Sequence, residues 1–334
     1  MYKSGFLFGF LTLIGVLGAG ALLGNQVLAG EIVAAKPLVN TALQALPTPQ
    51  VERAIMPQTD PREIYEVQPA PPVQIADAVE VPTITALSAL VVDAESGAVL
   101  YEREPDEGRG LASLTKLATA LTASSLEPMW AMTSTVDGYT EIVGRTFFTS
   151  GDIVTLRDLF FASLAGSSNR ASFQLADAIM PEGASFVAKM RLVLDELGFD
   201  TVEVADAAGL RVENSGTAWD VIKMFRLALD QPLLREALGS VVYELNTKQG
   251  EGRQVSTSNL LLLGDIPAGS VTVLAGKTGY LPEVGFNFVM EVEDENEHRL
   301  DVVVLGAEDH FARFTEAKKL ADWAFENYTW ENQK

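Results

Sequence analysis

The sequence contains no cysteine and only two histidines, His298 and His310. Without cysteine the chain has no disulfide bond, no thiolate nucleophile and no zinc–thiolate site. A metal site or a general base that depends on histidine would have to use one of these two residues. His298 lies in a polar stretch, residues 294–298, between two strand-like runs, which is typical of a solvated hairpin loop. Thiol chemistry and histidine clusters are therefore not expected.

Basic residues are also scarce, with 24 Lys and Arg against 45 Asp and Glu and a net charge of -21. Nucleic-acid binding requires a basic surface, so the charge argues against a nucleic-acid partner. It also argues against docking on anionic lipid headgroups. An anionic substrate would have to be held by a few local cations instead of by the field of the whole molecule.

The N-terminal segment, residues 1–29, predicts export from the cytoplasm. Lys3 precedes an uncharged apolar run from Gly5 to Leu23, which as a helix is about 28 Å long and close to the hydrocarbon thickness of a bilayer. Val27-Leu28-Ala29 would suit cleavage of a signal peptide, whereas the length of the run favours a retained signal-anchor. Either alternative places the rest of the chain on the extracytoplasmic side, with residues 5–23 anchoring it to the cytoplasmic membrane in the second case.

Residues 30–81 predict a Pro-rich disordered linker. Eight prolines lie between Pro37 and Pro72, and no apolar periodicity persists. Such a segment buries too little apolar surface to offset its ordering entropy. Pro-rich linkers are extended and semi-rigid, so we expect a domain held at a distance from a membrane.

Residues 82–330 predict one folded domain of the α+β class. Ser88–Asp93 and 98–101 predict a β-hairpin. Helices are predicted at 113–126, 156–165, 170–179, 184–197 and from Thr217 onward, strands at 271–274, 285–292 and 300–305, and a closing amphipathic helix at 312–328. Strands from both ends of the domain can join one antiparallel sheet flanked by helices. The helical insert then forms a lobe, with the site expected in a cleft between lobe and sheet.

The first of three chemical motifs, Ser113-Leu114-Thr115-Lys116, lies where a helix is expected to begin. Residues i and i+3 share a helix face, so the Lys116 amine can reach the Ser113 hydroxyl. A nucleophilic serine needs a base, and a free lysine with a pKa of about 10.4 is a poor one at neutral pH. Burial and a second cation would lower that pKa. Alone, the motif favours an ordinary helix cap, because serine and lysine are common and a serine near a helix start is usually just a cap.

Two further motifs supply the missing parts. Ser167-Ser168-Asn169 lies between two predicted helices, where Ser167 can relay a proton and Asn169 can hold a substrate amide; alone it fits a polar loop. Lys277-Thr278-Gly279 lies on a predicted strand. Lys277 is a candidate second cation, and Thr278 can hydrogen-bond a substrate carboxylate. Gly279 leaves the strand open to an extended substrate.

The three motifs occur once each and in this order, and they resemble the set found in penicillin-binding proteins and β-lactamases. Within that superfamily the sequence resembles the low-molecular-mass D-alanyl-D-alanine carboxypeptidases, serine peptidases of the S11 type. The resemblance covers about residues 81–328. It extends to the segments 112–120, 151–159, 206–210, 276–280, 285–287 and 313–325.

The resemblance implies a β-lactamase/transpeptidase-like fold and a set of residue roles. Ser113 is the implied nucleophile and Lys116 the acylation base. Ser167, Asn169 and Lys277 complete the implied proton-transfer network. The backbone N–H groups of Ser113 and Tyr280 form an oxyanion hole, Gly279 lies along the substrate, and Thr278 and Arg313 bind the substrate carboxylate.

The implied substrate is a peptidoglycan stem peptide that ends in D-Ala-D-Ala, and β-lactams are the implied inhibitors. No metal ion or organic cofactor is implied. The sequence departs from the family at Ser168, where glycine is more usual. It also ends after the closing helix, without the β-rich domain of many relatives. Relatives without that domain include D,D-endopeptidases, so cleavage of peptide cross-links is an alternative activity, and transfer to an amine acceptor also stays open.

Three other functions are weaker alternatives. A serine β-lactamase would use a glutamate followed four residues later by asparagine, but Glu203 is followed at that position by Ala207. A non-catalytic wall-binding module would not need the intact Ser113, Lys116 and Lys277. A Ser-His-Asp hydrolase lacks both a suitable histidine and a G-x-S-x-G elbow.

Overall fold

The computed structural model of the chain describes residues 70–76, 79–137, 143–180 and 183–330. The chain divides into two units, Met1–Arg53 and Ala54–Lys334, and every described residue lies in the second. The predicted apolar segment at 5–23 and residues 30–69 of the predicted linker lie outside the described residues. Over the described ranges, no helix combines the length and the apolar character needed to cross a membrane.

The strands of the described chain are β1 (Val73–Gln74), β2 (Ser88–Asp93), β3 (Val99–Arg103), β4 (Arg109–Gly110), β5 (Thr133–Thr135), β6 (Ile153–Thr155), β7 (Ser215–Gly216), β8 (Val242–Asn246), β9 (Gly252–Ser256), β10 (Thr272–Leu281), β11 (Gly285–Glu293), β12 (Arg299–Ala307) and β13 (Tyr328–Thr329). The helices are the 3₁₀ turn η2 (Ala112–Leu114), α1 (Thr115–Ser125), α2 (Leu156–Leu164), α3 (Asn169–Ile179), α4 (Phe186–Glu196), α5 (Ala218–Leu229), α6 (Pro232–Gly239), α7 (Leu260–Leu263) and α8 (Ala312–Asn327). β1 pairs with β13, so regular structure begins before the boundary predicted at residue 82.

A five-stranded antiparallel sheet organises the domain, in the order β10-β11-β12-β2-β3. The strands at its centre are β12, near the end of the chain, and β2, near the start of the domain. They pair from Leu300↔Asp93 to Leu305↔Ser88. The predicted union of strands from both ends of the domain is therefore confirmed, and the fold is α+β.

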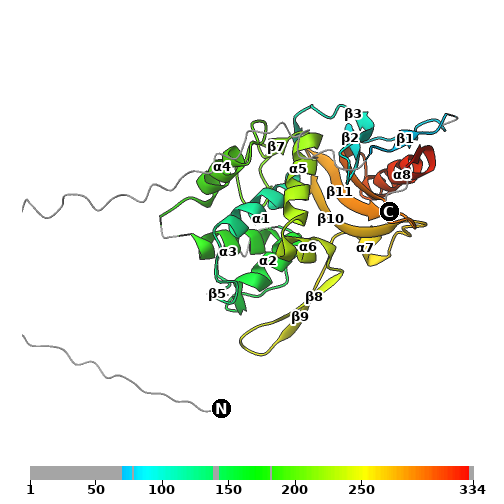
Figure 1. Cartoon of the computed structure of the whole chain (residues 1–334). Helices are drawn as coiled ribbons and strands as arrows, with labels where there is room; N and C mark the ends of the chain where they lie inside the picture. The colour runs from blue at the N-terminus through cyan, green and yellow to red at the C-terminus, as the bar shows by residue number, and fades with distance from the viewer. Residues whose placement is uncertain (1–69, 77–78, 138–142, 181–182, 331–334) are drawn as a thin grey trace, which may run out of the picture. The chain divides into compact units, whose positions relative to one another are not determined.

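Both faces of the sheet are buried, which explains its nearly continuous apolar strands. Along β2, Ala89 and Val91 face one core, and Leu90 and Val92 face the other. The closing helix α8 packs against β11 and β12 on the first face, whereas α5 and α6 cover the second (Figure 1). The sheet thus separates a small core under α8 from a larger core shared with the helical lobe.

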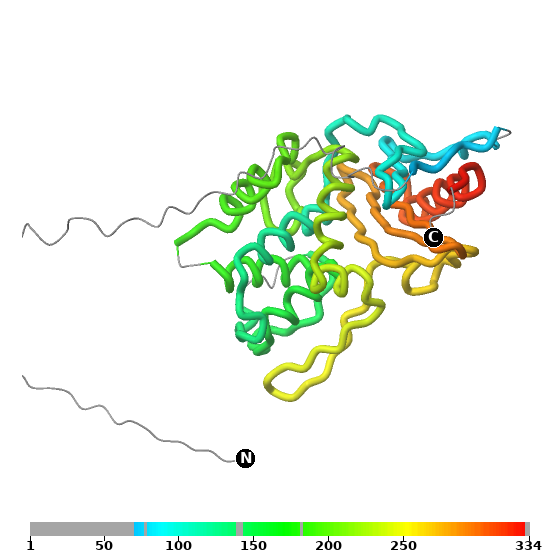
Figure 2. Tube along the Cα trace, viewed as in Figure 1, coloured from blue at the N-terminus to red at the C-terminus, as the bar shows by residue number. Residues whose placement is uncertain are grey.

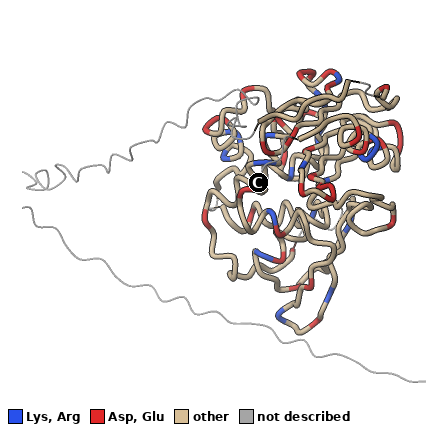
Figure 3. The backbone as a smooth tube through the Cα atoms, turned by 45° about the vertical axis from the view of Figure 1, so that its right-hand side comes forward, with Lys and Arg blue, Asp and Glu red and all other residues tan. Residues whose placement is uncertain are grey.

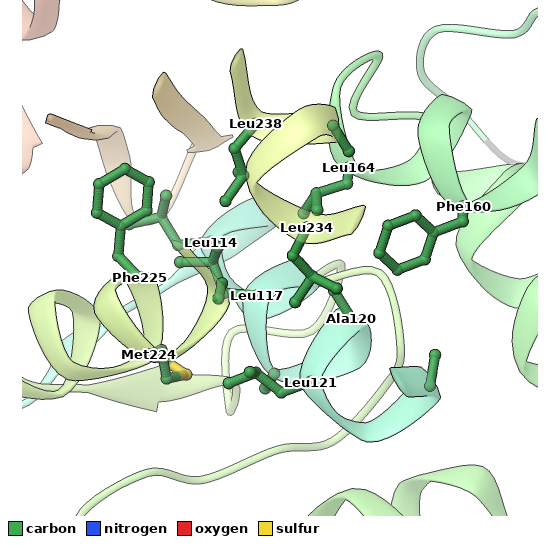
Figure 4. Packing of buried hydrophobic residues seen from close by; sticks show 14 of the residues in the cluster. Leu114, Leu117, Ala120, Leu121, Phe160, Leu164, Met224, Phe225, Leu234 and Leu238 are labelled. Atoms are coloured by element: carbon green, nitrogen blue, oxygen red, sulfur yellow. The ribbon is translucent and has the colours of Figure 1, made fainter. Parts of the chain in front are cut away.

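The helical lobe is built around α1, which contacts α2, α3, α4 and α5. Leu114, Leu117 and Leu121 project from the η2–α1 segment into the larger core. They meet side chains from α5 and α6, including Phe225 and Leu234 (Figure 4). Because α1 is surrounded on several sides, its position relative to the sheet is set by packing.

Some local features differ from the predictions. The helix predicted from residue 113 is divided, because Ser113 lies in the 3₁₀ turn η2 and α1 begins only at Thr115. The β8–β9 hairpin was not predicted; it extends from the body of the lobe, in the yellow part of the trace (Figure 2). Basic and acidic positions are interspersed along the described trace (Figure 3).

Candidate active site

The hydroxyl of Ser113 faces the amine of Lys116. Ser113 Oγ and Lys116 Nζ are 2.8 Å apart, as the i,i+3 spacing predicts. Lys116 is completely buried. The residue before the serine, Ala112, adopts a left-handed backbone conformation with φ of 48°. Such strain in a non-glycine residue is kept only when the surrounding structure imposes it, and it is typical of functional sites.

The Lys116 amine has three hydrogen-bond partners, Ser113 Oγ, Asn169 Oδ1 at 2.8 Å and the Ala208 carbonyl at 2.6 Å. A neutral amine has two hydrogens and one lone pair. Since the two carbonyl oxygens can only accept, they take both hydrogens, and the lone pair is left for the Ser113 hydroxyl proton. Burial lowers the pKa of Lys116 from 10.5 to about 7, against the opposing charge of Asp206. The arrangement therefore suits a lysine that acts as a base.

Asp206 holds the loop that carries the Ala208 carbonyl. Its carboxylate accepts hydrogen bonds from the four consecutive backbone amides of residues 208–211, at 2.6 to 3.2 Å. The Asn214 side chain donates to the same carboxylate. Gly209 completes the loop, since a Cβ there would lie 1.9 Å from the Ala112 carbonyl oxygen. The loop is thus pressed against the strained residue that precedes Ser113.

The second motif connects the lobe to both lysines. Asn169 begins α3, and its side-chain amide donates to the Val143 carbonyl at 2.7 Å while its oxygen accepts from Lys116. Ser168 is buried and caps α3 by accepting from Ala171, so it does not face the site. Ser167 has a left-handed backbone, with φ of 57°. In the first motif the strained residue, Ala112, precedes the serine, whereas in the second motif the strained residue is the serine itself, Ser167.

The third motif lies in β10 and supplies the second lysine. Lys277 Nζ is 2.8 Å from Ser167 Oγ and 3.0 Å from the Thr278 carbonyl. Lys277 is buried, and burial lowers its pKa well below the ordinary value, helped by the positive charges of Lys116, Arg313 and Arg145. Within the described ranges, Ser167 is hydrogen-bonded to Lys277 and not to Ser113. The two lysine–serine pairs are therefore separate.

Gly279 is explained by a close approach of the chain to itself. A Cβ at Gly279 would lie 2.8 Å from the Leu111 carbonyl and 3.3 Å from the Ser113 amide nitrogen. The absence of a side chain thus lets β10 lie directly against the turn that carries Ser113. The next residue, Tyr280, is half exposed and stacks on Phe286. The close approach of β10 to the Ser113 turn explains why glycine is needed at position 279, a reason that the sequence did not suggest.

Ser258 and Arg313 contact the last two residues of the third motif, Thr278 and Gly279. Thr278 shares a hydrogen bond with Ser258, with the two hydroxyl oxygens 2.6 Å apart. Arg313, on α8, donates to the Gly279 carbonyl at 3.0 Å and lies 3.0 Å from His310 Nδ1. Burial lowers the pKa of Arg313 to about 10, but it stays a cation at neutral pH. Because Arg313 is always a donor here, His310 must accept through Nδ1.

The structure brings all nine predicted residues into one region: Ser113, Lys116, Ser167, Asn169, Lys277, Thr278, Gly279, Tyr280 and Arg313. Sequence reasoning missed Ser258 and His310. Ser258 lies between Thr257 and Asn259 ahead of four leucines, which looks like an ordinary helix start. His310 has no partner within a motif, and only its position on the turn before α8 brings it to Arg313.

No carboxylate of the described residues hydrogen-bonds to Ser113 or Lys116. Glu203, the weak lactamase candidate, is exposed, and its backbone pairs with Ser215. Asp206 uses its oxygens on backbone amides and Asn214. The described residues thus offer a serine nucleophile, a lysine base and nearby cations, and no carboxylate among them is hydrogen-bonded to either Ser113 or Lys116.

Comparison with known proteins agrees with this geometry. The sequence profile of one family, described as D-alanyl-D-alanine carboxypeptidase, matches residues 75–309. A D-alanyl-D-alanine endopeptidase of Pseudomonas aeruginosa is 28% identical over 248 residues, which cover 71% of this chain and 76% of the relative. The carboxypeptidase DacC of Escherichia coli is 30% identical over 271 residues, which cover 74% of this chain but only 63% of the relative.

Solved structures show the same fold. A D-alanyl-D-alanine carboxypeptidase from Mycobacterium tuberculosis superposes with a TM-score of 0.65 at 25% identity, covering 76% of this chain and 96% of that one. The Streptomyces K15 DD-transpeptidase superposes with a TM-score of 0.67 at 23% identity, covering 74% of this chain and all of that one. The predicted β-lactamase/transpeptidase-like fold is confirmed.

Proposed function

The chain belongs to the D-alanyl-D-alanine carboxypeptidase family of serine peptidases, and from that membership we propose that it cleaves D-Ala-D-Ala stem peptides through an acyl-enzyme on Ser113. The observation that carries the proposal is the set of hydrogen-bond partners around the Lys116 amine. Its two carbonyl partners leave a lone pair directed at the Ser113 hydroxyl, 2.8 Å away. A buried lysine with a pKa of about 7 can act as a base at neutral pH.

Acylation follows from these contacts. Lys116 takes the proton of the Ser113 hydroxyl, and the oxygen attacks the carbonyl of the penultimate D-alanine. The backbone N–H groups of Ser113 and Tyr280 hold the resulting oxyanion, which the close packing of Gly279 supports by keeping β10 against Ser113. Thr278 and Arg313 bind the substrate carboxylate, a role that suits a hydroxyl and a cation lying near the same strand.

Collapse of the intermediate breaks the amide bond. The Ser167–Lys277 pair gives a proton to the departing nitrogen, and D-alanine leaves as the free amine while Lys116 keeps the proton taken from Ser113. Water then attacks the ester: it returns one proton to the Ser167–Lys277 pair, its hydroxide joins the acyl carbon, and Lys116 gives its proton back to the Ser113 oxygen as the shortened peptide is released. Since no carboxylate among the described residues contacts Ser113 or Lys116, a β-lactam adduct is expected to be cleared slowly.

Labelling of the purified full chain with a fluorescent penicillin tests the proposal, with Ser113→Ala as control. The expected result is a stoichiometric protein-bound label that lasts for many minutes and is missing from the variant. D-alanine should be released from a D-Ala-D-Ala peptide by the wild type alone. Rapid loss of label with accumulating hydrolysed penicillin would identify a β-lactamase instead. A folded wild type that takes no label would point to a non-catalytic wall-binding module.

Cleavage of peptide cross-links is the second candidate, because an endopeptidase and a carboxypeptidase match the chain at 28% and 30% identity. The two reactions share the acyl-enzyme and differ in the amine that leaves. Purified muropeptides separate them: a carboxypeptidase shortens the pentapeptide stem, whereas an endopeptidase converts cross-linked dimers into monomers. An extracytoplasmic location, with anchoring by residues 5–23, is part of the proposal. Fractionation of cells and N-terminal sequencing of the mature chain would test it.

A further inference from the structure

Arg145 lies at the edge of the site and was not assigned a role above. It belongs to the segment between β5 and β6. Its guanidinium donates to the Gly166 carbonyl at 3.3 Å and to Ser256 Oγ at 2.7 Å. The group also lies over the ring of Phe147, 5.2 Å from its centre. Since Gly166 directly precedes Ser167, these contacts hold Arg145 beside the second motif.

A short run of hydroxyl groups leads from Arg145 to the predicted carboxylate site. Ser256 accepts from Arg145, and Ser258, two residues further on, shares its hydrogen bond with Thr278. Two residues of chain span at most about 7 Å. These two contacts therefore place Arg145 and Thr278 in the same region of the site. The positive charge of Arg145 also reaches Lys277, where it contributes to the lowered pKa.

The two guanidinium groups in this region have no acidic partner in the described part of the chain. Neither Arg145 nor Arg313 forms an ion pair there, although the sequence has 45 acidic residues. Elsewhere on the described chain, Arg157, Arg226 and Arg253 each pair with carboxylates. Like charges that gather without a counter-ion repel each other, and an anionic ligand relieves that repulsion. A substrate carboxylate bound at Thr278 and Arg313 would neutralise Arg313, but Arg145 would still have no anionic partner among the described residues.

We propose that Arg145 and Ser256 form a second carboxylate subsite, which binds an acidic group on the leaving residue of the substrate. This proposal rests on the proposed function. The first carboxylate, next to the scissile amide, binds at Thr278 and Arg313, and the side chain of the same residue extends along the hydroxyl run to Arg145. D-alanine has only a methyl group and cannot reach it. The leaving branch of a cross-linked stem peptide, joined through a diamino acid, carries a further carboxylate and can.

Substrates with matched leaving groups test the subsite in the full chain. The N-acylated dipeptides D-Ala–D-Glu, D-Ala–D-α-aminoadipate and D-Ala–D-α-aminopimelate carry acidic side chains of increasing length. D-Ala–D-Gln is the neutral match of the first, and D-Ala–D-Lys is the cationic one. A hydrogen bond to a charged group is expected to make kcat/KM about ten- to a hundredfold higher for the best acidic leaving group than for D-Gln.

Variants at Arg145 then identify its source. In Arg145→Gln the acidic preference should fall to about one, and in Arg145→Glu it should turn towards D-Lys. Arg299→Gln is the matched control, because Arg299 pairs with Glu293 at the end of the β11–β12 pair away from Tyr280. It should keep the wild-type preference. Ratios between substrates cancel any general effect of Arg145 on Lys277.

The outcomes separate the subsite from the function it rests on. If the wild type takes no penicillin label on Ser113 and releases no D-alanine, the proposed function has failed. If it does both but shows no acidic preference, the subsite is wrong and the function stands. An acidic preference that survives in Arg145→Gln also overturns the subsite. So does a preference that follows acidic groups on the acyl side of the scissile bond instead of the leaving side.

Discussion

The buried amine of Lys116 leads to a quantitative prediction for the pH dependence of acylation. Only the neutral amine can take the Ser113 proton, and its pKa is lowered from 10.5 to about 7. At pH 7 about half of the molecules then carry the base form, against roughly one in three thousand for an unperturbed lysine. Below pH 7 the neutral fraction falls about tenfold per pH unit, reaching about 1% at pH 5.

The assay is the second-order rate constant for labelling by a fluorescent penicillin between pH 5 and 9. The logarithm of this rate should rise with a slope near one below pH 7 and level off above it. Penicillin carries a carboxylate that stays ionised over this range, so the profile reports the enzyme. A rate that is flat from pH 5 upward, or that keeps rising to pH 9 without levelling off, would refute Lys116 as a base with a lowered pKa.

The same pKa has a consequence for stability. The folded-state value lies below the unfolded one, so the unfolded chain binds more protons between pH 7 and 10.5. Stability should therefore rise with pH across that window, by up to about 5 kcal/mol for this group. Lys116→Met removes the titration. Its free energy of unfolding should exceed that of the wild type most at pH 6, and the difference should shrink by about 1.4 kcal/mol per pH unit above 7. A pH-independent difference in denaturant titrations would contradict the burial argument.

Three further predictions concern the residues around the site. Gly279→Ala places a Cβ 2.8 Å from the Leu111 carbonyl and should slow penicillin acylation by about 10²-fold while the fold survives; an unchanged rate would mean that the oxyanion site tolerates the shift. Asp206→Ala leaves four backbone amides without their acceptor and should lower the free energy of unfolding by about 3 kcal/mol in denaturant titrations, together with the acylation rate. His310→Phe removes the acceptor of Arg313 and should raise KM for D-Ala-D-Ala peptides more than it changes kcat. In the wild type the same rise in KM should occur as falling pH protonates His310, whose pKa burial and Arg313 lower from 6.5; His298→Phe serves as control and should behave as wild type.

The fold could be predicted in outline because its signals are local and repeated. The boundaries of α2, α3, α4 and α5 follow the apolar period, and α2 and α5 are preceded by the N-cap residues Thr155 and Thr217, which form capping boxes with Asp158 and Asp220. The β8–β9 hairpin was missed because its exposed residues carry no apolar alternation to distinguish it from a loop. The 3₁₀ turn at Ser113 was missed because Ala112, whose backbone is left-handed, packs closely against Gly209, a residue far along the chain.

The candidate site, like the fold, has features that the local sequence determined and others that only the tertiary structure decided. The contact between Ser113 and Lys116 follows from helical spacing, so the sequence by itself determined that pair, the order of the three motifs and the supply of two lysines without a histidine base. Tertiary structure alone decided which groups surround them. Lys116 meets Ala208 across 92 positions of chain, and Lys277 meets Ser167 across 110. Desolvation, which lowers both lysine pKa values, depends on everything packed around an atom, and no short stretch of sequence specifies that. For the same reason Ser258, His310 and Arg145 acquire roles only where the folded chain brings them beside Thr278, Arg313 and Ser256.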